Sequence, residues 1–320
     1  MNIAVIGVGG IGAFYGMILH QAGCNVTFVA RGEHLHYLQN NTMKITHPNY
    51  TIEDKIETYS LDELTENFKA DHFDAIFIAT KAMSTEHISK TLGEWTKDTQ
   101  DIPYYISLQN GVENEDIMQR YYNKEYVIGG LSRLIVSHLV SLGHVHCEGG
   151  VETLLGALHH TSKNKIFLEK LKNILDTTQT KTVICEDIKL ELWNKLIVNN
   201  GVNAICALAE EESGPLINND KTSKLIYGLM SEAALASNAV GVSLTQDDAD
   251  KMFELYKQFQ SVKPSMFVDK ENNRDLELEQ ICGVVVRNCE KLGVDAPYTR
   301  TISTLLEFTY NKQRNSTKDV

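Results

Sequence analysis

The segment Ile3-Ala4-Val5-Ile6-Gly7-Val8-Gly9-Gly10-Ile11-Gly12 lies close to the start of the chain. Its apolar beginning predicts a buried strand, and the residues that follow predict a helix through Leu19. Glycines between a strand and a helix permit a tight turn and let backbone N–H groups approach a pyrophosphate. A glycine-rich turn without a ligand is the plain alternative. The position inside a first strand–helix–strand unit favours a dinucleotide site formed by Gly7, Val8, Gly9, Gly10, Ile11 and Gly12.

Short apolar runs recur through the first part of the chain, and segments with helical periodicity separate them. The runs are residues 3–6, 26–29, 75–79, 104–108 and 127–128. This pattern is typical of a parallel sheet that is covered on both faces. From about residue 187 long amphipathic stretches follow without a convincing strand. We therefore predict an α/β Rossmann domain over residues 1–185, with a mostly parallel sheet and helices on both faces, and an all-α domain over residues 186–320.

The length, charge and cysteine content of the chain exclude several classes of protein. The chain has 320 residues, enough for two domains, and 30 basic against 42 acidic residues give a net charge of −12. This charge disfavours nucleic acid or an anionic membrane as a partner. The six cysteines and eleven histidines show no metal-ligand spacing, so we expect reduced thiols and no metal. No signal peptide or membrane helix is predicted, which favours a cytoplasmic protein, and the polar tail 311–320 is expected to fray.

Arg31 bears on whether the dinucleotide is NAD or NADP(H). It follows Gly12 by 19 residues, at the end of the second predicted strand. A site for NAD would place Asp or Glu there to bind the ribose 2′-hydroxyl, whereas a guanidinium can pair with a 2′-phosphate. The alternative is an exposed loop arginine. The sequence thus favours NADPH as the cofactor.

Two further polar residues follow predicted strands. Lys81 comes just after residues 75–79, and Asn110 just after residues 104–108. Open α/β sheets bind ligands at the carboxyl ends of their strands. Taken singly, Lys81 is equally consistent with a solvated loop, and Asn110 with a tight turn before Gly111. Their shared sheet edge with the glycine motif favours a role in binding.

A polar stripe marks the first helix of the second domain. Lys195, Asn199 and Asn203 recur at intervals of four residues within an otherwise apolar segment. Asn is a poor helix former, so a stripe that faces a cleft explains it better than the alternative, a solvated face. A partly desolvated lysine between amides is suited to donate a proton to a carbonyl oxygen. Further on, Ser265 and Glu277 are by themselves best explained as a helix cap and an exposed helix carboxylate.

Together these segments resemble the ketopantoate reductase family, whose reaction is that of 2-dehydropantoate 2-reductase. The likeness covers nearly the whole chain, and it is carried by an ordered set of motifs: Gly7 to Gly12, Val29-Ala30-Arg31-Gly32, Thr80-Lys81-Ala82, Gln109-Asn110-Gly111-Val112, Trp193-Asn194-Lys195-Leu196 with Asn199 and Asn203, and Ser265-Met266 followed by Glu277. The resemblance implies a Rossmann domain followed by a helical domain, with the substrate between them and NADPH as the reductant.

The resemblance also implies a role for each residue. Lys195 would be the general acid toward the ketone oxygen, and Glu277 would complete the acid/base network. Asn199 and Asn203 would hold polar groups of the substrate, and Ser265 its carboxylate. Lys81 and Asn110 would lie where nicotinamide, ribose and substrate meet, so that Asn110 serves both cofactor and substrate.

The chain departs from the family pattern at a few positions. They are Leu278-Glu279, Cys282-Gly283, Tyr298-Thr299 and the stretch 129–141. We expect these departures to affect the substrate pocket more than the cofactor loop.

The resulting hypothesis is an oxidoreductase that reduces 2-dehydropantoate to (R)-pantoate with NADPH, as a step of pantothenate and coenzyme A biosynthesis. One alternative is a D-2-hydroxyacid dehydrogenase of the same family that acts on branched or aromatic 2-keto acids. Another is a non-catalytic protein that only binds NADPH, although the joint presence of Lys195, Asn199, Asn203, Ser265 and Glu277 speaks against it. The expected partner is a small 2-keto acid, and the apolar faces of the helical domain are compatible with a homodimer.

Overall fold

The computed structural model describes residues 1–316, which form two compact units. The first comprises residues 1–109 and 113–188, and the second comprises residues 110–112 and the chain from Lys189 onward. The division after Ile188 falls three residues beyond the expected boundary, because the Ile188 side chain packs closely on Gly129 and Gly156 of the first unit. Residues 110–112 join the second unit because Val112 packs against its apolar core, which the strand pattern did not predict.

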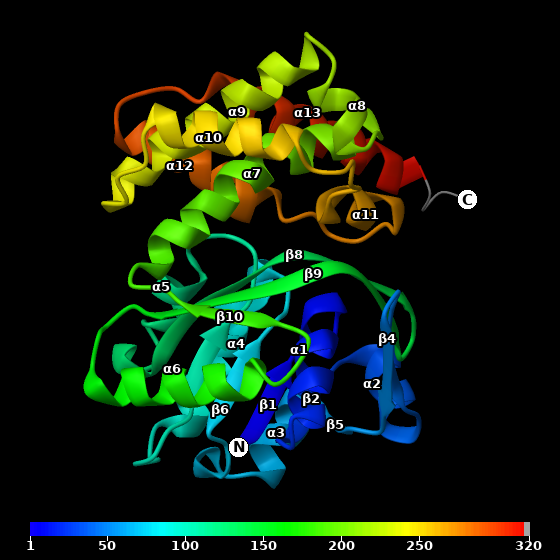
Figure 1. The fold of residues 1–320 in the computed structure, drawn as a ribbon, viewed down its shortest axis with the longest axis vertical. Coiled ribbons are helices and arrows are strands. Elements are labelled where there is room, and N and C mark those ends of the chain that lie inside the picture. Colours follow the sequence, from blue (N-terminus) through cyan, green and yellow to red (C-terminus); the bar gives the residue numbers. More distant parts are fainter. Residues whose placement is uncertain (317–320) are drawn as a thin grey trace. The chain divides into compact units, whose positions relative to one another are not determined.

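The first unit is a ten-stranded sheet with helices packed on it (Figure 1). Its strands are β1 (Asn2–Ile6), β2 (Asn25–Val29), β3 (Met43–His47), β4 (Tyr50–Asp54), β5 (Glu57–Tyr59), β6 (Ala75–Ile78), β7 (Tyr104–Ser107), β8 (Val127–Ser141), β9 (His144–Ala157) and β10 (Lys181–Ile184). Its helices are α1 (Gly10–Gln21), α2 (Gly32–Asn40), α3 (Leu61–Asn67), α4 (Thr85–Thr96), α5 (Asn114–Met118) and α6 (Ser162–Leu175), with short 3-10 turns η1 (Ala70–His72), η2 (Ala82–Ser84) and η3 (Lys124–Tyr126).

The strand order is β4-β3-β9-β8-β7-β6-β1-β2-β5, and β10 pairs with β9. Among the described residues all strand pairs are parallel except β3 with β4 and β8 with β9, which confirms the predicted, mostly parallel sheet. The short run expected at residues 127–128 is the beginning of β8, which forms a long antiparallel hairpin with β9 (Figure 1). Only its first residues are continuously buried, so the apolar pattern revealed only that part.

Two apolar cores lie on opposite faces of this sheet, because successive side chains of a strand point to opposite sides. On β1, Ile3 and Val5 belong to the core beneath α1 and α6, whereas Ala4 and Ile6 belong to the core beneath α4. Burial on both faces explains why the strands are continuously apolar rather than alternating. The predicted cover of helices on both faces is confirmed.

The second unit consists of helices and connecting loops, with no strand among its described residues, as predicted. Its helices are α7 (Ile188–Ala209, which starts in the first unit), α8 (Ser213–Ile217), α9 (Thr222–Ser237), α10 (Gln246–Lys257), α11 (Ser265–Glu271), α12 (Val284–Lys291) and α13 (Pro297–Ser316), with a 3-10 turn η4 (Asn238–Val240) and a π-helical turn η5 (Glu279–Gly283). The expectation of a frayed tail from residue 311 is wrong as far as Ser316, since α13 continues to that residue. Residues 317–320 lie outside the described part of the chain.

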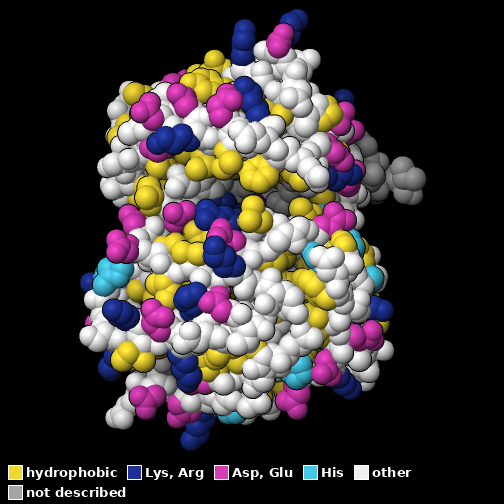
Figure 2. Space-filling model, in the orientation of Figure 1, with side chains coloured by type: hydrophobic (Ala, Val, Ile, Leu, Met, Phe, Trp, Pro, Cys, Tyr) yellow, Lys and Arg dark blue, Asp and Glu magenta, His cyan; other side chains and the backbone are white. Residues whose placement is uncertain are grey.

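The cysteines are thiols, and two of the histidines take part in hydrogen bonds within the sheet. All six cysteines are free thiols, and all except Cys185 are buried. His144 and His146 both form a hydrogen bond with the Thr46 hydroxyl. Within residues 1–316 no group of His, Cys, Asp or Glu is arranged to hold a metal ion, and no described helix is long and apolar enough to cross a membrane. On the face drawn in Figure 2, basic and acidic side chains are interspersed.

Candidate active site

The glycine motif lies at the point where the strand order reverses direction. β1 has β2 on one side and β6 on the other, which is where open α/β sheets bind ligands. The ends of three strands are level, because Ile6 is in register with Ile78, and Ile78 with Ser107. The turns after β1 and β6 are therefore neighbours at one edge of the sheet.

In the motif, two glycines have no room for a side chain, whereas a third borders open space. Gly7 has a φ of 95°, and a Cβ atom on it would lie 2.7 Å from Thr80 Cγ2. A Cβ atom on Gly12 would lie only 1.8 Å from the Gly7 carbonyl oxygen, so the turn and α1 can pack this closely only with glycine there. Gly9, by contrast, has no atom within 4 Å of such a Cβ position. The turn thus leaves open space beside its backbone.

The beginning of α1 is suited to an anion. Gly9 occupies the capping position of α1, but no side chain there accepts a hydrogen bond, and the first turn of α1 has no acidic residue. The N–H groups of this first turn and the positive end of the helix dipole are therefore available to an anion. Val8 is buried in the core, so it can contribute to a ligand only through its backbone, whereas Ile11 is half-buried and packs against that core. The cradle of small residues fits the pyrophosphate of a dinucleotide.

Arg31 lies at the end of β2 as the residue that precedes α2. Its side chain is exposed, and no hydrogen bond or ion pair of its guanidinium is found among the described residues. This geometry agrees both with a phosphate-binding arginine and with an exposed loop arginine. The role of Arg31 stays a prediction.

Gln109 organises the turn after β6, and its contribution was not predicted from the sequence. Its Nε2 atom donates to the carbonyl oxygen of Thr80 at 3.1 Å and to the hydroxyl of Thr85 at 2.9 Å, and the side chain is buried. Lys81, half-buried, follows Thr80 directly and precedes η2. Gln109 thus holds the segment that carries Lys81 against the end of β7.

In the second unit, the predicted stripe lies on α7. Asn203 is 3% exposed, while Lys195 and Asn199 are half-buried. The amides of Asn199 and Asn203 make no hydrogen bond within the described residues, which leaves them able to bind a ligand. Asn200 differs from them, because its buried amide donates to the Leu229 carbonyl oxygen at 2.8 Å and to Thr299 Oγ1 at 2.9 Å.

The Lys195 ammonium is electrostatically unusual. Burial lowers the pKa of Lys195 from 10.5 to about 8, and the negative charge of Glu277 opposes part of this shift. Glu277 is itself 7% exposed, so it is not the exposed helix carboxylate that its sequence context suggested. Asn110 Nδ2 donates to Glu277 Oε2 at 3.5 Å. The second unit therefore brings together three of the predicted residues, Lys195, Glu277 and Asn110.

Ser265 is the first residue of α11, and its side chain is exposed. Pro264 occupies the capping position, where no side-chain hydrogen bond is made. The interpretation of Ser265 as a helix cap is therefore wrong. Its hydroxyl, which makes no hydrogen bond to another described residue, is free to bind a ligand.

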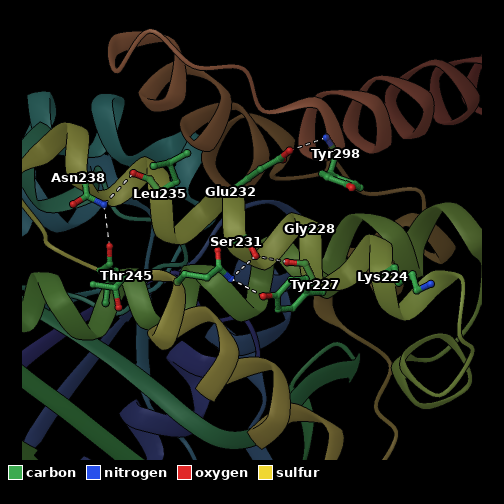
Figure 3. Close-up of a pocket in the computed structure, with 11 residues that line it drawn as sticks. Lys224, Tyr227, Gly228, Ser231, Glu232, Leu235, Asn238, Thr245 and Tyr298 are labelled. Carbon is green, nitrogen blue, oxygen red and sulfur yellow. Dashed lines mark hydrogen bonds between the residues drawn. The ribbon is translucent and has the colours of Figure 1, made fainter.

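A groove of about 470 Å³ lies between α9, the start of α10 and Tyr298, and none of the predicted site residues lines it (Figure 3). Its polar groups bind one another: Gln246 Nε2 donates to Tyr227 Oη and Ser231 Oγ, both at 2.9 Å. Glu232 accepts the N–H of Tyr298 at 2.9 Å (Figure 3), and the N–H of the next residue at 2.7 Å. Residues 298–299, where the chain departs from the family pattern, thus use their backbone N–H groups in a cap at the start of α13.

Comparisons with known proteins define the class of this fold and site. The sequence model of ketopantoate reductase PanE/ApbA matches residues 3–160, and that of its C-terminal part matches residues 187–309. A 2-dehydropantoate 2-reductase of Archaeoglobus fulgidus is 27% identical over 305 residues, which are 95% of this chain and 96% of the relative. The protein is therefore an oxidoreductase that acts on CH–OH groups. The chain belongs to the ketopantoate reductase family.

Solved structures agree with this fold. The crystal structure of 2-dehydropantoate 2-reductase from Geobacter metallireducens has a TM-score of 0.83 at 25% identity and covers 97% of this chain and 100% of its own. A ternary structure of D-mandelate dehydrogenase with NADH and anilino(oxo)acetate has a TM-score of 0.87 at 22% identity, with 98% and 99% of the two chains covered. The second likeness supports the fold alone.

Proposed function

We propose that this protein reduces 2-dehydropantoate to (R)-pantoate with NADPH, as a step of pantothenate and coenzyme A biosynthesis. The observation that carries the proposal is the desolvated Lys195, whose pKa is lowered to about 8 on a helix face that also presents two unengaged amides. A lysine of this kind is charged near neutral pH yet gives up its proton readily. The family and the named relatives support the choice of substrate.

The glycine turn would hold the pyrophosphate of NADPH through backbone N–H groups, and Arg31 would pair with its 2′-phosphate. Lys81 and Asn110 would contact the nicotinamide ribose. When bound, the cofactor supplies the hydride that the ketone carbon receives. The open space beside Gly9 and the uncapped start of α1 support this assignment.

The residues of the second unit would act on the keto acid. Lys195 donates a proton to the ketone oxygen, so that hydride and proton together convert the ketone into an alcohol. Glu277 compensates the ammonium before the transfer and takes part in its reprotonation. The amides of Asn199 and Asn203 orient the polar groups of the substrate, and Ser265 binds its carboxylate.

A D-2-hydroxyacid dehydrogenase of the same family, acting on branched or aromatic 2-keto acids, is the second candidate, because D-mandelate dehydrogenase has the same fold. Steady-state rates with 2-dehydropantoate, ketoisovalerate and phenylglyoxylate decide between the two. We expect kcat/KM to be highest for 2-dehydropantoate. A higher value for either of the other keto acids would assign the chain to the dehydrogenase instead.

The rate should depend on pH through Lys195. A general acid must be protonated, and the pKa of Lys195 is about 8, so kcat for reduction is expected to be constant at lower pH and to fall about tenfold per pH unit above it. The measurement is kcat at saturating NADPH and keto acid between pH 6 and 10. A kcat that stays level up to pH 10 would show that Lys195 does not supply the proton.

Arg31 should determine the preference for NADPH. The Arg31→Asp variant is expected to raise the dissociation constant of NADPH by roughly 10- to 100-fold, the loss of a hydrogen-bonded charge pair, with little change for NADH. Titration of both nucleotides against the purified variant measures this difference, and Arg300→Asp, a change at an exposed arginine of α13, is the control. Equal weakening of both nucleotides would mean that the 2′-phosphate is held by another group.

A homodimer also stays a prediction. A ketopantoate reductase from Staphylococcus aureus, described as dimeric, has the same fold with a TM-score of 0.73 at 19% identity. Exposed apolar side chains on the helical unit, among them Leu305 and Phe308 of α13, support self-association. Sedimentation of the purified protein measures its mass directly.

A further inference from the structure

The turn that follows α7 contains a residue in an unfavourable conformation. Glu210, the first residue after the helix, has a φ of 54°, in the left-handed region that favours glycine. The N–H group of Glu211 donates to the Cys206 carbonyl oxygen at 3.2 Å, a bond typical of helices that end in this way. A glutamate at such a position needs an interaction that compensates the strain.

Lys270 of α11 supplies that interaction. Its side chain is only 6% exposed, and its Nζ atom donates to Glu210 Oε1 and to the Ala207 carbonyl oxygen, both at 2.9 Å. The Ala207 carbonyl lies in the last turn of α7, where intrahelical donors are missing and a cation is favoured. A buried lysine is tolerated only with such partners, so Lys270 joins α11 to the end of α7.

The segment after α7 also binds the chain that precedes α11. The Ser213 N–H group donates to the Val262 carbonyl oxygen at 3.0 Å, and the Val262 N–H group donates to Ser213 Oγ at 3.1 Å. Ser265 lies between these two attachments, three residues after Val262 and five before Lys270. Its position relative to α7 is therefore set by residues 210–214.

We propose that Lys270 and Glu210 are positioning residues that place the Ser265 hydroxyl for the carboxylate of the 2-keto acid. The inference rests on the proposed function, which assigns Ser265 to that carboxylate. Neither residue belongs to the polar stripe of α7. Loss of the pair is therefore expected to raise KM for the keto acid and to leave kcat and NADPH binding nearly unchanged.

Steady-state kinetics of Lys270→Met, Ser265→Ala and the double variant test the connection. Lys270→Met should raise KM for the keto acid about tenfold, the loss of most of one hydrogen bond to a charged group. In the double variant KM should equal that of Ser265→Ala, because a positioning residue has nothing to add once the positioned hydroxyl is gone. Additive effects of the two changes would overturn the proposal.

Glu210→Gly tests positioning separately from stability. It relieves the left-handed strain but also removes the carboxylate partner of the buried Lys270 ammonium. These two effects on stability oppose each other, so the melting temperature of this variant should lie close to that of the wild type. Its KM for the keto acid should nevertheless rise, whereas Glu210→Gln, which keeps an oxygen acceptor for Lys270, should restore most of the affinity. If Glu210→Gly leaves KM within about twofold, the pair has only a structural role.

Hydrogen exchange of the ligand-free protein separates this inference from the proposed function. Lys270→Met should increase amide exchange in residues 265–271 and leave α10 unchanged. If the wild type reduces no 2-keto acid, the proposed function fails, and with it the proposed role of the pair, even if exchange shows that the contact stabilises α11. If the wild type is active but exchange and KM are unchanged in Lys270→Met, the inference alone is overturned.

Discussion

Lys195→Ala should lower kcat for the 2-keto acid by about 10²- to 10⁴-fold, the usual contribution of a positioned general acid. The physical reason is the environment of the ammonium: burial lowers the pKa of Lys195 to about 8, so the proton is present near neutral pH and easily transferred. Without it, the alkoxide that forms as hydride reaches carbon would have no donor. Steady-state turnover at saturating NADPH and keto acid measures the loss.

NADPH binding should be nearly unchanged in this variant, because the glycine turn belongs to the other compact unit. Lys224→Ala is the matched control, since Lys224 is an exposed lysine of α9 in the same helical unit, and it should keep the wild-type kcat. Full turnover by Lys195→Ala would exclude the assigned role. A loss of folded protein would be detected by circular dichroism and would not be counted as a catalytic effect.

Gly12→Ala should abolish tight dinucleotide binding. The added Cβ atom would lie 1.8 Å from the Gly7 carbonyl oxygen, whereas real Cβ atoms essentially never come within 3.0 Å of another heavy atom. The turn must therefore open, and the N–H groups at the start of α1 move away from the position that a pyrophosphate requires. Titration with NADPH should give a dissociation constant at least about 100-fold above that of the wild type, equivalent to two or more hydrogen bonds to a charged group.

Alanine variants at Gly9 and Gly150 distinguish the effect of backbone strain from that of a direct clash with the ligand. Alanine at Gly9 or at Gly150 meets no atom within 4 Å, and neither residue has a positive φ. Both variants should fold like the wild type, but only Gly9→Ala should weaken NADPH, because its methyl group enters the space beside the turn. NADPH affinity that is unchanged in Gly9→Ala and Gly12→Ala would place the dinucleotide elsewhere.

The class of fold was predictable because burial on both faces of the central strands produces continuous apolar runs. The glycine motif was predictable because local backbone geometry requires glycine. Gly7 has a positive φ, and Gly12 lies too close to the Gly7 carbonyl oxygen for a side chain. The length of β8 was not predictable. Beyond its buried beginning the strand is half-exposed or exposed, and its pairing with β9 depends on distant residues.

The site in the second unit could be predicted only in part. Lys195, Asn199 and Asn203 follow from helical spacing, whereas the burial of Glu277 and its hydrogen bond with Asn110 join positions 167 residues apart. No local pattern reports such a contact. Gln109 and Lys270 were missed for the same reason, because a buried glutamine or lysine looks like a surface residue until its partners are known.

Reduction of a 2-keto acid by NADPH can be measured by following NADPH and the hydroxy acid product in the same assay. Purified protein should oxidise NADPH only when 2-dehydropantoate is added, and (R)-pantoate should appear in equal molar amount. If NADPH binds but stays unoxidised with 2-dehydropantoate and with every other 2-keto acid supplied, the chain is a nucleotide-binding protein without this activity, and the proposed function is wrong.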